Sequence, residues 1–382
     1  MPSWPSGTLR SKVCAKRNRA RPWYFPFRKN KEDEVASSIL AEGFAQRSEV
    51  SSKGEVLLFT RRGLIFLTML DTISKELKLK IRQFPVSDQI IFNNRLIEID
   101  KYHFQSIPET SSSKSIAFID GGQAEILSAG NFCLSFIRVG AVVYFQQKKI
   151  KDHLHEFYLL TTAKYENNDL LYEAKIFPSK GEKIIDESDL IISSTDNSIK
   201  TGQERASITQ VTSIARRFTE LALASKVSAD IIVMDGTLES SYHHEEKYLA
   251  KLPEHACALA KSSSLFTASG NSPSILLNKL NPLGNWGYFL EQDTYFVKLH
   301  QRSKHVFRFT GNRDFLPYLM ENSQDALFLG YPYGLIVADK FARVSHEEKK
   351  SLKMNILLKA DNREIVEYLS ATNAHDILDN LG

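Results

Sequence analysis

The sequence predicts an α/β fold, a mixed sheet flanked by helices, behind an N-terminal extension. Two apolar runs, at residues 115–119 and 229–234, end in Asp-Gly and are typical of strands. Between them, residues 204–225 repeat apolar side chains close to every 3.6 positions, which indicates a helix with one buried side. A chain of 382 residues suits one elaborated domain with appendages.

Composition is that of a globular protein with a large core. Hydrophobic residues make up 42% and charged residues 25% of the chain, which are ordinary proportions. The apolar run at 64–70 is far shorter than the roughly 20 residues that span a bilayer, and the N-terminus has no apolar signal region. We therefore expect a cytoplasmic protein without a membrane partner. The few, widely spaced cysteines Cys14, Cys133 and Cys257 predict neither a disulfide framework nor a cysteine zinc site.

The basic charge of the chain is concentrated in its N-terminal tail. Nine basic residues precede Glu32, the first acidic residue of the chain. The rest of the chain has 40 basic and 45 acidic residues. Trp23, Tyr24, Phe25 and Phe27 interleave with these charges, so the tail suits phosphate contacts and base stacking. A solvated tail without a specific partner is the alternative.

The order of the predicted elements matches the ribonuclease-H-like fold. We expect a basic tail and a short helix over residues 1–50, an accessory region over 51–110, and the main domain over 111–382, with a polar linker at 108–114. The predicted elements of the main domain are strands at 115–119, 132–139, 141–146 and 155–165, a helix at 204–225, a strand at 229–234, a helix at 245–252, strands at 256–260, 288–300 and 305–310, and helices at 313–320 and 363–369. The run at 229–234 is almost wholly apolar, which predicts a central strand covered on both faces.

Two carboxylates at the ends of apolar strands form the strongest chemical pattern. Asp120 and Asp235 are each followed by glycine, which lets a chain turn sharply while the carboxylate stays exposed. Since ligands of open α/β sheets gather at the carboxyl ends of strands, both side chains are expected to face one cleft. Carboxylates bind Mg²⁺ and Mn²⁺, and two such ions activate water and stabilise the leaving oxygen of a phosphodiester. Ordinary Asp-Gly turns are the alternative.

A third carboxylate is expected from the helix between these strands. Glu220 lies at the border of the apolar helix face, with Glu204 as the second choice. A surface glutamate paired with Arg216, four residues earlier, is the alternative. Lys261 follows an apolar run and suits a strand end, where its ammonium group can meet a phosphate or a carboxylate.

These motifs resemble the NurA family of nucleases, in the family's order and over about residues 115–380. The resembling segments are IDGG at 119–122, RFTELA at 217–222, VMDGTL at 233–238, AKSS at 260–263 and GYPYGL at 330–335. NurA proteins are similar to ribonuclease H in fold, act on DNA ends and single strands with Mn²⁺, form dimers, and work with the hexameric translocase HerA in end resection. By resemblance, Asp120, Glu220 and Asp235 are the metal carboxylates and Tyr331 is a site residue.

The resemblance implies a metal-dependent DNA exonuclease and single-strand endonuclease. Its cofactor would be Mn²⁺ or Mg²⁺, with two ions, and its partners would be DNA, a second copy of the chain and a HerA-like ATPase. The sequence departs from the family at Gly122, where serine is usual, and at Asp339, where a histidine is expected eight residues after Tyr331. A carboxylate there can bind a metal ion but differs from imidazole in charge and proton affinity. A surface Asp339 paired with Lys340 or Arg343 is the alternative.

Two other classes of function stay open. Actin-like ATPases and sugar kinases also use Asp-Gly turns, there to hold nucleotide phosphates through backbone amides. They need a second equivalent domain and a Gly-rich adenosine-binding segment, and neither is evident in this sequence. The other class is a catalytically inactive scaffold that docks on a translocase. The retained carboxylates argue against a scaffold, whereas the departure at Asp339 leaves it possible.

Overall fold

The computed structural model describes residues 61–85, 88–110, 113–200, 202–281, 283–328, 330–359 and 362–372. The chain forms two compact units, Met1–Gln83 and Phe84–Gly382. The described part of the first unit is helix α2 (Arg61–Gln83). The predicted basic tail and its short helix lie outside the described residues. In the described part of the chain, no helix has the length and apolar character needed to cross a membrane.

The division between the units differs from the predicted boundary near residue 110. The second unit begins at Phe84. Residues after this point belong to it because β3 (Phe104–Ser106) pairs with β11 (Trp286–Phe289) at the edge of the large sheet. A small hairpin of β1 (Gln89–Phe92) and β2 (Arg95–Glu98) precedes β3.

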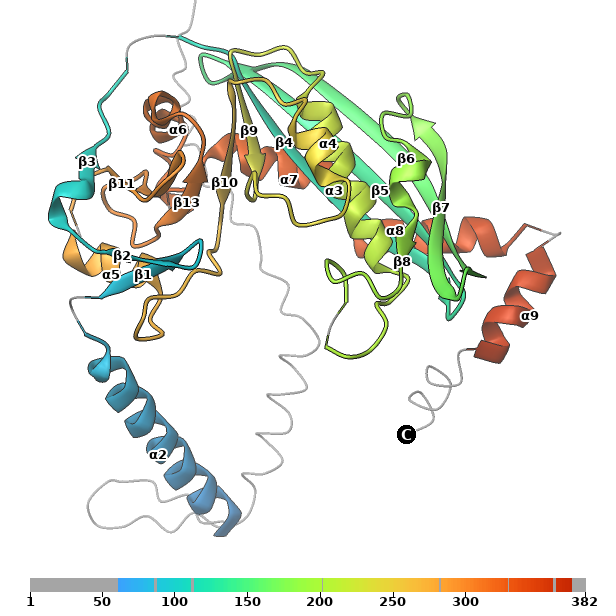
Figure 1. Ribbon diagram of the computed structural model, residues 1–382, viewed down its shortest axis with the longest axis horizontal. Helices are drawn as coiled ribbons and strands as arrows, with labels where there is room; N and C mark the ends of the chain where they lie inside the picture. Colours follow the sequence, from blue (N-terminus) through green and yellow to red (C-terminus); the bar gives the residue numbers. More distant parts are fainter. Residues whose placement is uncertain are drawn as a thin grey trace, which may run out of the picture. The chain divides into compact units, whose positions relative to one another are not determined.

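The second unit is built on a mixed sheet of 11 strands in the order β3-β11-β12-β13-β10-β9-β4-β5-β6-β7-β8 (Figure 1). Its strands not yet given are β4 (Ile116–Ala129), β5 (Phe132–Phe145), β6 (Lys148–Glu166), β7 (Asp169–Lys180), β8 (Ile192–Ser193), β9 (Ile231–Asp235), β10 (Ala256–Ala260), β12 (Thr294–Lys298) and β13 (Phe307–Thr310).

Five of these strands have the predicted ribonuclease-H-like arrangement. β4, β5 and β6 are consecutive antiparallel neighbours. On the other side of β4, β9 is parallel to it, and β10 is parallel to β9. Helix α3 (Gln210–Ala224) lies in the sequence between the two groups of strands. The fold is therefore a mixed α/β sheet flanked by helices, and β9 is the central buried strand that its continuous apolar run predicted.

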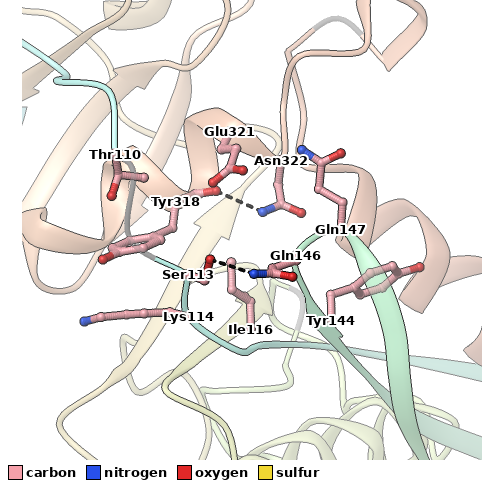
Figure 2. A pocket seen from close by; sticks show the side chains of 10 residues that line it. All are labelled: Thr110, Ser113, Lys114, Ile116, Tyr144, Gln146, Gln147, Tyr318, Glu321 and Asn322. Carbon is pink, nitrogen blue, oxygen red and sulfur yellow. Dashed lines mark hydrogen bonds between the residues drawn. The ribbon is translucent and has the colours of Figure 1, made fainter.

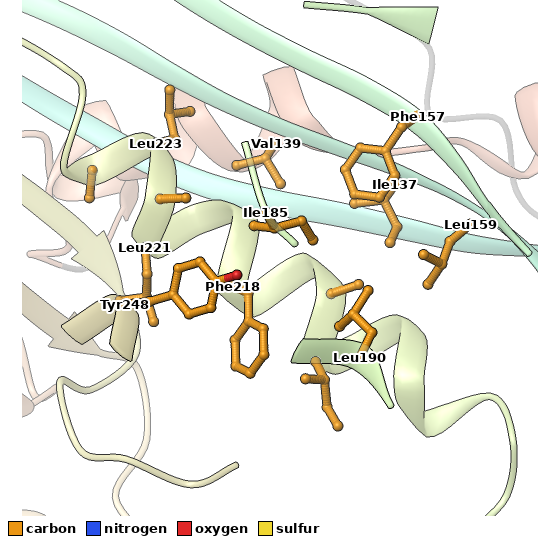
Figure 3. Packing of buried hydrophobic residues seen from close by; sticks show 14 of the residues in the cluster. Ile137, Val139, Phe157, Leu159, Ile185, Leu190, Phe218, Leu221, Leu223 and Tyr248 are labelled. Carbon is orange, nitrogen blue, oxygen red and sulfur yellow. The ribbon is translucent and has the colours of Figure 1, made fainter. Parts of the chain in front are cut away.

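Alternation of side chains gives the sheet two apolar faces. Ile119 of β4 belongs to the core beneath α3, whereas its neighbour Phe118 belongs to the core on the opposite face. Figure 3 shows the first core, in which Phe218 of α3 stacks on Tyr248 of α4 (Glu245–Leu249) with 4.7 Å between ring centroids. Burial of both faces explains why the central strands carry so few polar residues.

The opposite face is covered by helices from the C-terminal part of the chain (Figure 1). Helix α7 (Tyr333–Ala342) packs there with α6 (Leu316–Glu321). The remaining helical elements are α5 (Pro273–Leu280), α8 (His346–Leu357), α9 (Arg363–Thr372), η1 (Lys101–His103), η2 (Glu187–Leu190), η3 (Arg313–Phe315) and η4 (Ala326–Phe328).

Several element boundaries differ from the predicted ones. The strands predicted at 132–139 and 141–146 form one strand, β5, because Gly140 is not a break: its bare backbone lies against the Phe341 ring of α7. The strand predicted at 288–300 is a hairpin, whose turn holds Gln292 and Asp293 at φ 48 and 57. β7, α5 and α8 were not predicted. β7 has alternating apolar residues from Leu170 to Ile176, a strand signal that the sequence reasoning missed, whereas α5 and α8 show no clear apolar period.

Candidate active site

The two predicted aspartates are neighbours at the point where β4 and β9 separate. The pairing of these parallel strands runs to Ile119 and Met234, and Asp120 and Asp235 are the next residue on each strand. Because side chains alternate along strands, both carboxylates point toward the face that α7 covers. β9 then ends, and Gly236 turns the chain away with φ 104. The second Asp-Gly is thus the predicted strand end.

The first Asp-Gly is not a strand end, and this corrects the prediction. β4 continues through Gly121 and Gly122 to Ala129, paired with β5. A Cβ atom at Gly121 would overlap the carboxylate of Glu220, which comes from α3. On the other face, a Cβ atom at Gly122 would overlap the carbonyl oxygen of Ala342 at the end of α7. The two glycines therefore do not form a turn. They allow α3 and α7 to approach β4 closely, one on each face of the strand.

The three predicted carboxylates interact electrostatically. Burial, together with the charges of Glu220 and Asp235, raises the pKa of Asp120 to about 7, against a hydrogen bond donated by the Gly121 N–H at 2.7 Å and the charge of Lys261. Burial also raises the pKa of Glu220, which is 4% exposed, and the ion pair with Arg216 offsets this in part. Glu220 is thus paired with Arg216, as the alternative had it, but inside the protein, where its charge acts on Asp120.

Asp235 has two protein partners, both predicted as site residues. The Lys261 ammonium donates to Asp235 Oδ2 at 2.6 Å, and the Tyr331 hydroxyl donates to Oδ1 at 3.0 Å. Burial lowers the pKa of Lys261, but the hydrogen bond and the charges of Asp235 and Asp120 outweigh burial and leave the pKa raised. Burial and the same carboxylate raise the pKa of Tyr331. At neutral pH the cluster therefore holds a cation and a neutral hydroxyl donor.

Asp339 lies at the rim of this cluster, on α7. It forms an ion pair with Arg343 one turn further along, which is the predicted surface alternative. Its charge also raises the pKa of Lys261 and of Tyr331. Asp339 is therefore both paired on the helix surface and within electrostatic reach of the cluster. Glu204, the second choice for the third carboxylate, is exposed and precedes α3.

A buried ion pair that sequence reasoning left unassigned holds the loop between β9 and α4. Arg217 Nε donates to Glu245 Oε1 at 2.7 Å, and Nη2 donates to the Thr237 carbonyl at 2.6 Å. Glu245 Oε2 accepts the Ser241 N–H at 2.8 Å. Both ends of the loop that follows Asp235 are thus fixed to the helix that carries Glu220. The available signal was a pair of adjacent arginines, 216 and 217, within an amphipathic helix.

The chemistry of the donor set fits a hard divalent cation, because all three buried or half-buried acids offer carboxylate oxygens. Within the described ranges, however, no group of three or more His, Cys, Asp or Glu side chains is placed to hold a metal ion. Glu220 and Asp235 instead direct an oxygen at Arg216 and Lys261. Metal binding by these residues therefore requires rearrangement of one or both ion pairs.

A polar cavity of about 260 Å³ lies apart from the carboxylates, at the start of β4 (Figure 2). Its lining includes Ile116, Tyr144 and Tyr318, and Lys114 Nζ lies 5.2 Å from the Tyr318 ring centroid. The Gln146 amide donates to Ser113 Oγ at 3.2 Å. None of the predicted site residues lines this cavity.

Comparison with known proteins gives only weak structural similarity. The sequence matches no protein-family model and no curated protein. Among solved structures, it is similar to Ciona intestinalis Endonuclease V in complex with a 24mer DNA containing an inosine followed by a ribo-adenosine, with a TM-score of 0.35 and 12% identity over 64% of this chain and 89% of that chain. The catalytic domain of human Endonuclease V gives a TM-score of 0.27 and 10% identity over 74% and 98%. The fold assignment rests on the strand order described above.

Proposed function

We propose that this protein is a metal-dependent DNA nuclease whose site is formed by Asp120, Glu220 and Asp235. The observation that carries the proposal is the position of the two aspartates, which occupy matching places on neighbouring parallel strands. The buried Glu220 of α3 lies close enough to act on both of them through its charge. Burial and the charges of Glu220 and Asp235 raise the pKa of Asp120 to about 7. A site that gathers repelling carboxylates is suited to bind added cations.

The residues around the carboxylates have separate roles in this proposal. Asp120, Glu220 and Asp235 would hold Mn²⁺ or Mg²⁺, which supplies activation of water and stabilisation of the leaving oxygen of a phosphodiester when two ions are bound. Lys261 releases Asp235 and turns its ammonium to a phosphate oxygen of the DNA. Tyr331 keeps its hydrogen bond to Asp235 and fixes the orientation of that carboxylate.

We further propose a biological setting from the resemblance to NurA nucleases. In this setting the protein is a cytoplasmic homodimer that acts as an exonuclease and a single-strand endonuclease. It processes DNA ends together with a HerA-like hexameric translocase. The order and spacing of the resembling motifs, from IDGG at 119–122 to GYPYGL at 330–335, support this part of the proposal.

Incubation with end-labelled single- and double-stranded DNA tests the proposal. Cleavage is expected in Mn²⁺ or Mg²⁺, without ATP, and none in EDTA. Asp235→Asn should abolish it, because an amide lacks the negative charge that holds the metal. Glu166→Gln is the matched control, since it removes one carboxylate from the exposed pair of Glu166 with Lys164. Cleavage at the wild-type rate by Asp235→Asn would exclude the assigned site.

The inactive scaffold is the second candidate. The ion pairs of Glu220 with Arg216 and of Asp235 with Lys261 favour it, because they satisfy the carboxylates without metal. A scaffold would cleave no DNA anywhere in a Mn²⁺ titration, and its binding to a translocase would be unaffected by Asp235→Asn. An actin-like ATPase would require ATP for any activity, so cleavage in its absence separates that class.

A further inference from the structure

A buried arginine lies beside the candidate site without a full set of partners. Arg308 of β13 is 4% exposed. Its Nη1 donates to Glu239 Oε2 at 3.2 Å, and its Nη2 pairs with Glu239 Oε1. Its Nε is buried and has no hydrogen-bond partner among the residues that the structure describes. A buried guanidinium with a free donor is costly unless another acceptor binds it. The forked contact with Glu239 is the geometry in which arginine also binds phosphate.

Glu239 is poorly suited to be the permanent partner of this arginine. Its side chain is 50% exposed, so it leaves the pair at little cost in desolvation. It lies near the middle of the loop between β9 and α4, whose ends are held by the bonds of Arg217 to Thr237 and of Glu245 to Ser241. The middle of the loop can therefore move outward while its ends, and Asp235 before them, stay in place.

Arg308 is also near the proposed chemistry. It pairs across the sheet with Ala260, the residue before Lys261, and β10 separates its strand from β9. Two strand spacings place it about 10 Å from the end of β9, a distance that about three stacked nucleotides span. By side-chain alternation Arg308 points to the α3 side of the sheet, from which Glu220 approaches, and its guanidinium carbon lies 5.5 Å from the Phe92 ring centroid. Asp120 and Asp235 point to the opposite side, so a strand bound by both would pass around the end of β9.

We propose that Arg308 forms a binding site for a backbone phosphate of the DNA strand, and that Glu239 occupies this site as an internal phosphate substitute until DNA displaces it. The proposal rests on the proposed nuclease function and adds to it a second anchoring point for the strand. It also makes the loop between β9 and α4 an inhibitory element, because the free protein must break one forked ion pair to bind DNA.

Binding of a fluorescent single-stranded oligonucleotide in EDTA, across a salt titration, tests this proposal without cleavage. Glu239→Gln should raise affinity about fivefold, the worth of a partly exposed ion pair. Arg308→Met should reduce the slope of log affinity against log salt by about 0.7, the contribution of one phosphate on a single strand. In the double variant the gain from Glu239→Gln should disappear. Glu166→Gln, with the same charge change in an exposed pair, should alter affinity less than twofold.

Other outcomes overturn the proposal. Weaker binding by Glu239→Gln would show that the pair only stabilises the loop. A gain that survives Arg308→Met would show that net charge alone is responsible. If Arg308→Met does not fold, Arg308→Lys replaces it, and the gain from Glu239→Gln should then shrink because lysine lacks the fork. Metal-dependent cleavage is measured separately. A wild-type protein that binds DNA as predicted but does not cleave it would contradict the proposed nuclease function and still support the phosphate-binding site at Arg308.

Discussion

Replacement of Asp120 by asparagine should stabilise the metal-free protein while it abolishes cleavage. The change keeps the shape of the side chain and an oxygen that can accept the Gly121 N–H. It removes a buried charge that Glu220 and Asp235 repel. Loss of cleavage and gain of stability together are expected only of a carboxylate that is placed for a ligand rather than for the fold.

The size of the gain follows from the pKa of Asp120. In the folded protein this pKa is raised from 3.8 to about 7, so the folded state binds the proton more tightly than the unfolded state. Stability therefore falls as pH rises from about 4 to 7. The free energy of unfolding that the charged Asp120 removes is about 4 kcal/mol near pH 8, as an order of magnitude, and about 1.5 kcal/mol near pH 5.

Urea unfolding in EDTA, near pH 5 and near pH 8, measures this effect. The advantage of Asp120→Asn over the wild type should grow by about 2.5 kcal/mol between the two conditions. Addition of Mn²⁺ should stabilise the wild type and leave the variant nearly unchanged. Asp325→Asn, at an exposed loop position, is the control and should show no such growth. An advantage of Asp120→Asn that does not depend on pH would refute the assignment of the buried charge.

Three further predictions concern other parts of the chain. Arg217→Ala should lower the free energy of unfolding by about 3 to 5 kcal/mol, because it leaves Glu245 buried without a counter-charge; in a double variant with Glu245→Gln, urea unfolding should show a smaller loss than the sum of the two single changes. Asp339→Ala should raise the Mn²⁺ concentration needed for half-maximal cleavage, whereas Asp339→His should retain cleavage; superimposable titration curves would exclude Asp339 from the site. Deletion of residues 1–31 should weaken DNA binding and flatten its salt dependence without affecting cleavage at saturating DNA, and an unchanged slope would assign the tail another purpose.

The central part of the fold could be predicted because its signals are local. A buried parallel strand needs a continuous apolar run, and residues 229–234 have one. A helix on one face needs a 3.6 period, and α3 has it. The alternation of these segments determines the strand order of a ribonuclease-H-like sheet. The same reasoning brought Asp120 and Asp235 together, because the pairing of β4 with β9 ends just before both residues, although β4 itself continues beyond Asp120.

What escaped prediction depends on contacts between distant segments. Gly121 and Gly140 looked like chain breaks, but each meets a side chain more than 90 residues away, from Glu220 and Phe341. Arg217 pairs with Glu245 and Arg308 with Glu239, and nothing in the local sequence marks these partners. The role of residues 84–110 was equally hidden, because the short β3 becomes part of a sheet only through β11.

The two aspartates of the site differ in how firmly their backbone is held. Asp120 lies in the middle of a strand that stays hydrogen-bonded to β5 for nine further residues and is enclosed by α3 and α7 at bare glycines. Asp235 is the last residue of its strand, followed by a glycine at φ 104. The backbone at Asp120 is thus held on both sides of the residue, whereas the backbone at Asp235 is held by its strand on one side only. If the protein is the proposed nuclease, adjustment of the site to ions of different radius is expected at Asp235, and the loop attached to Asp235 is the one that Glu239 ties to Arg308.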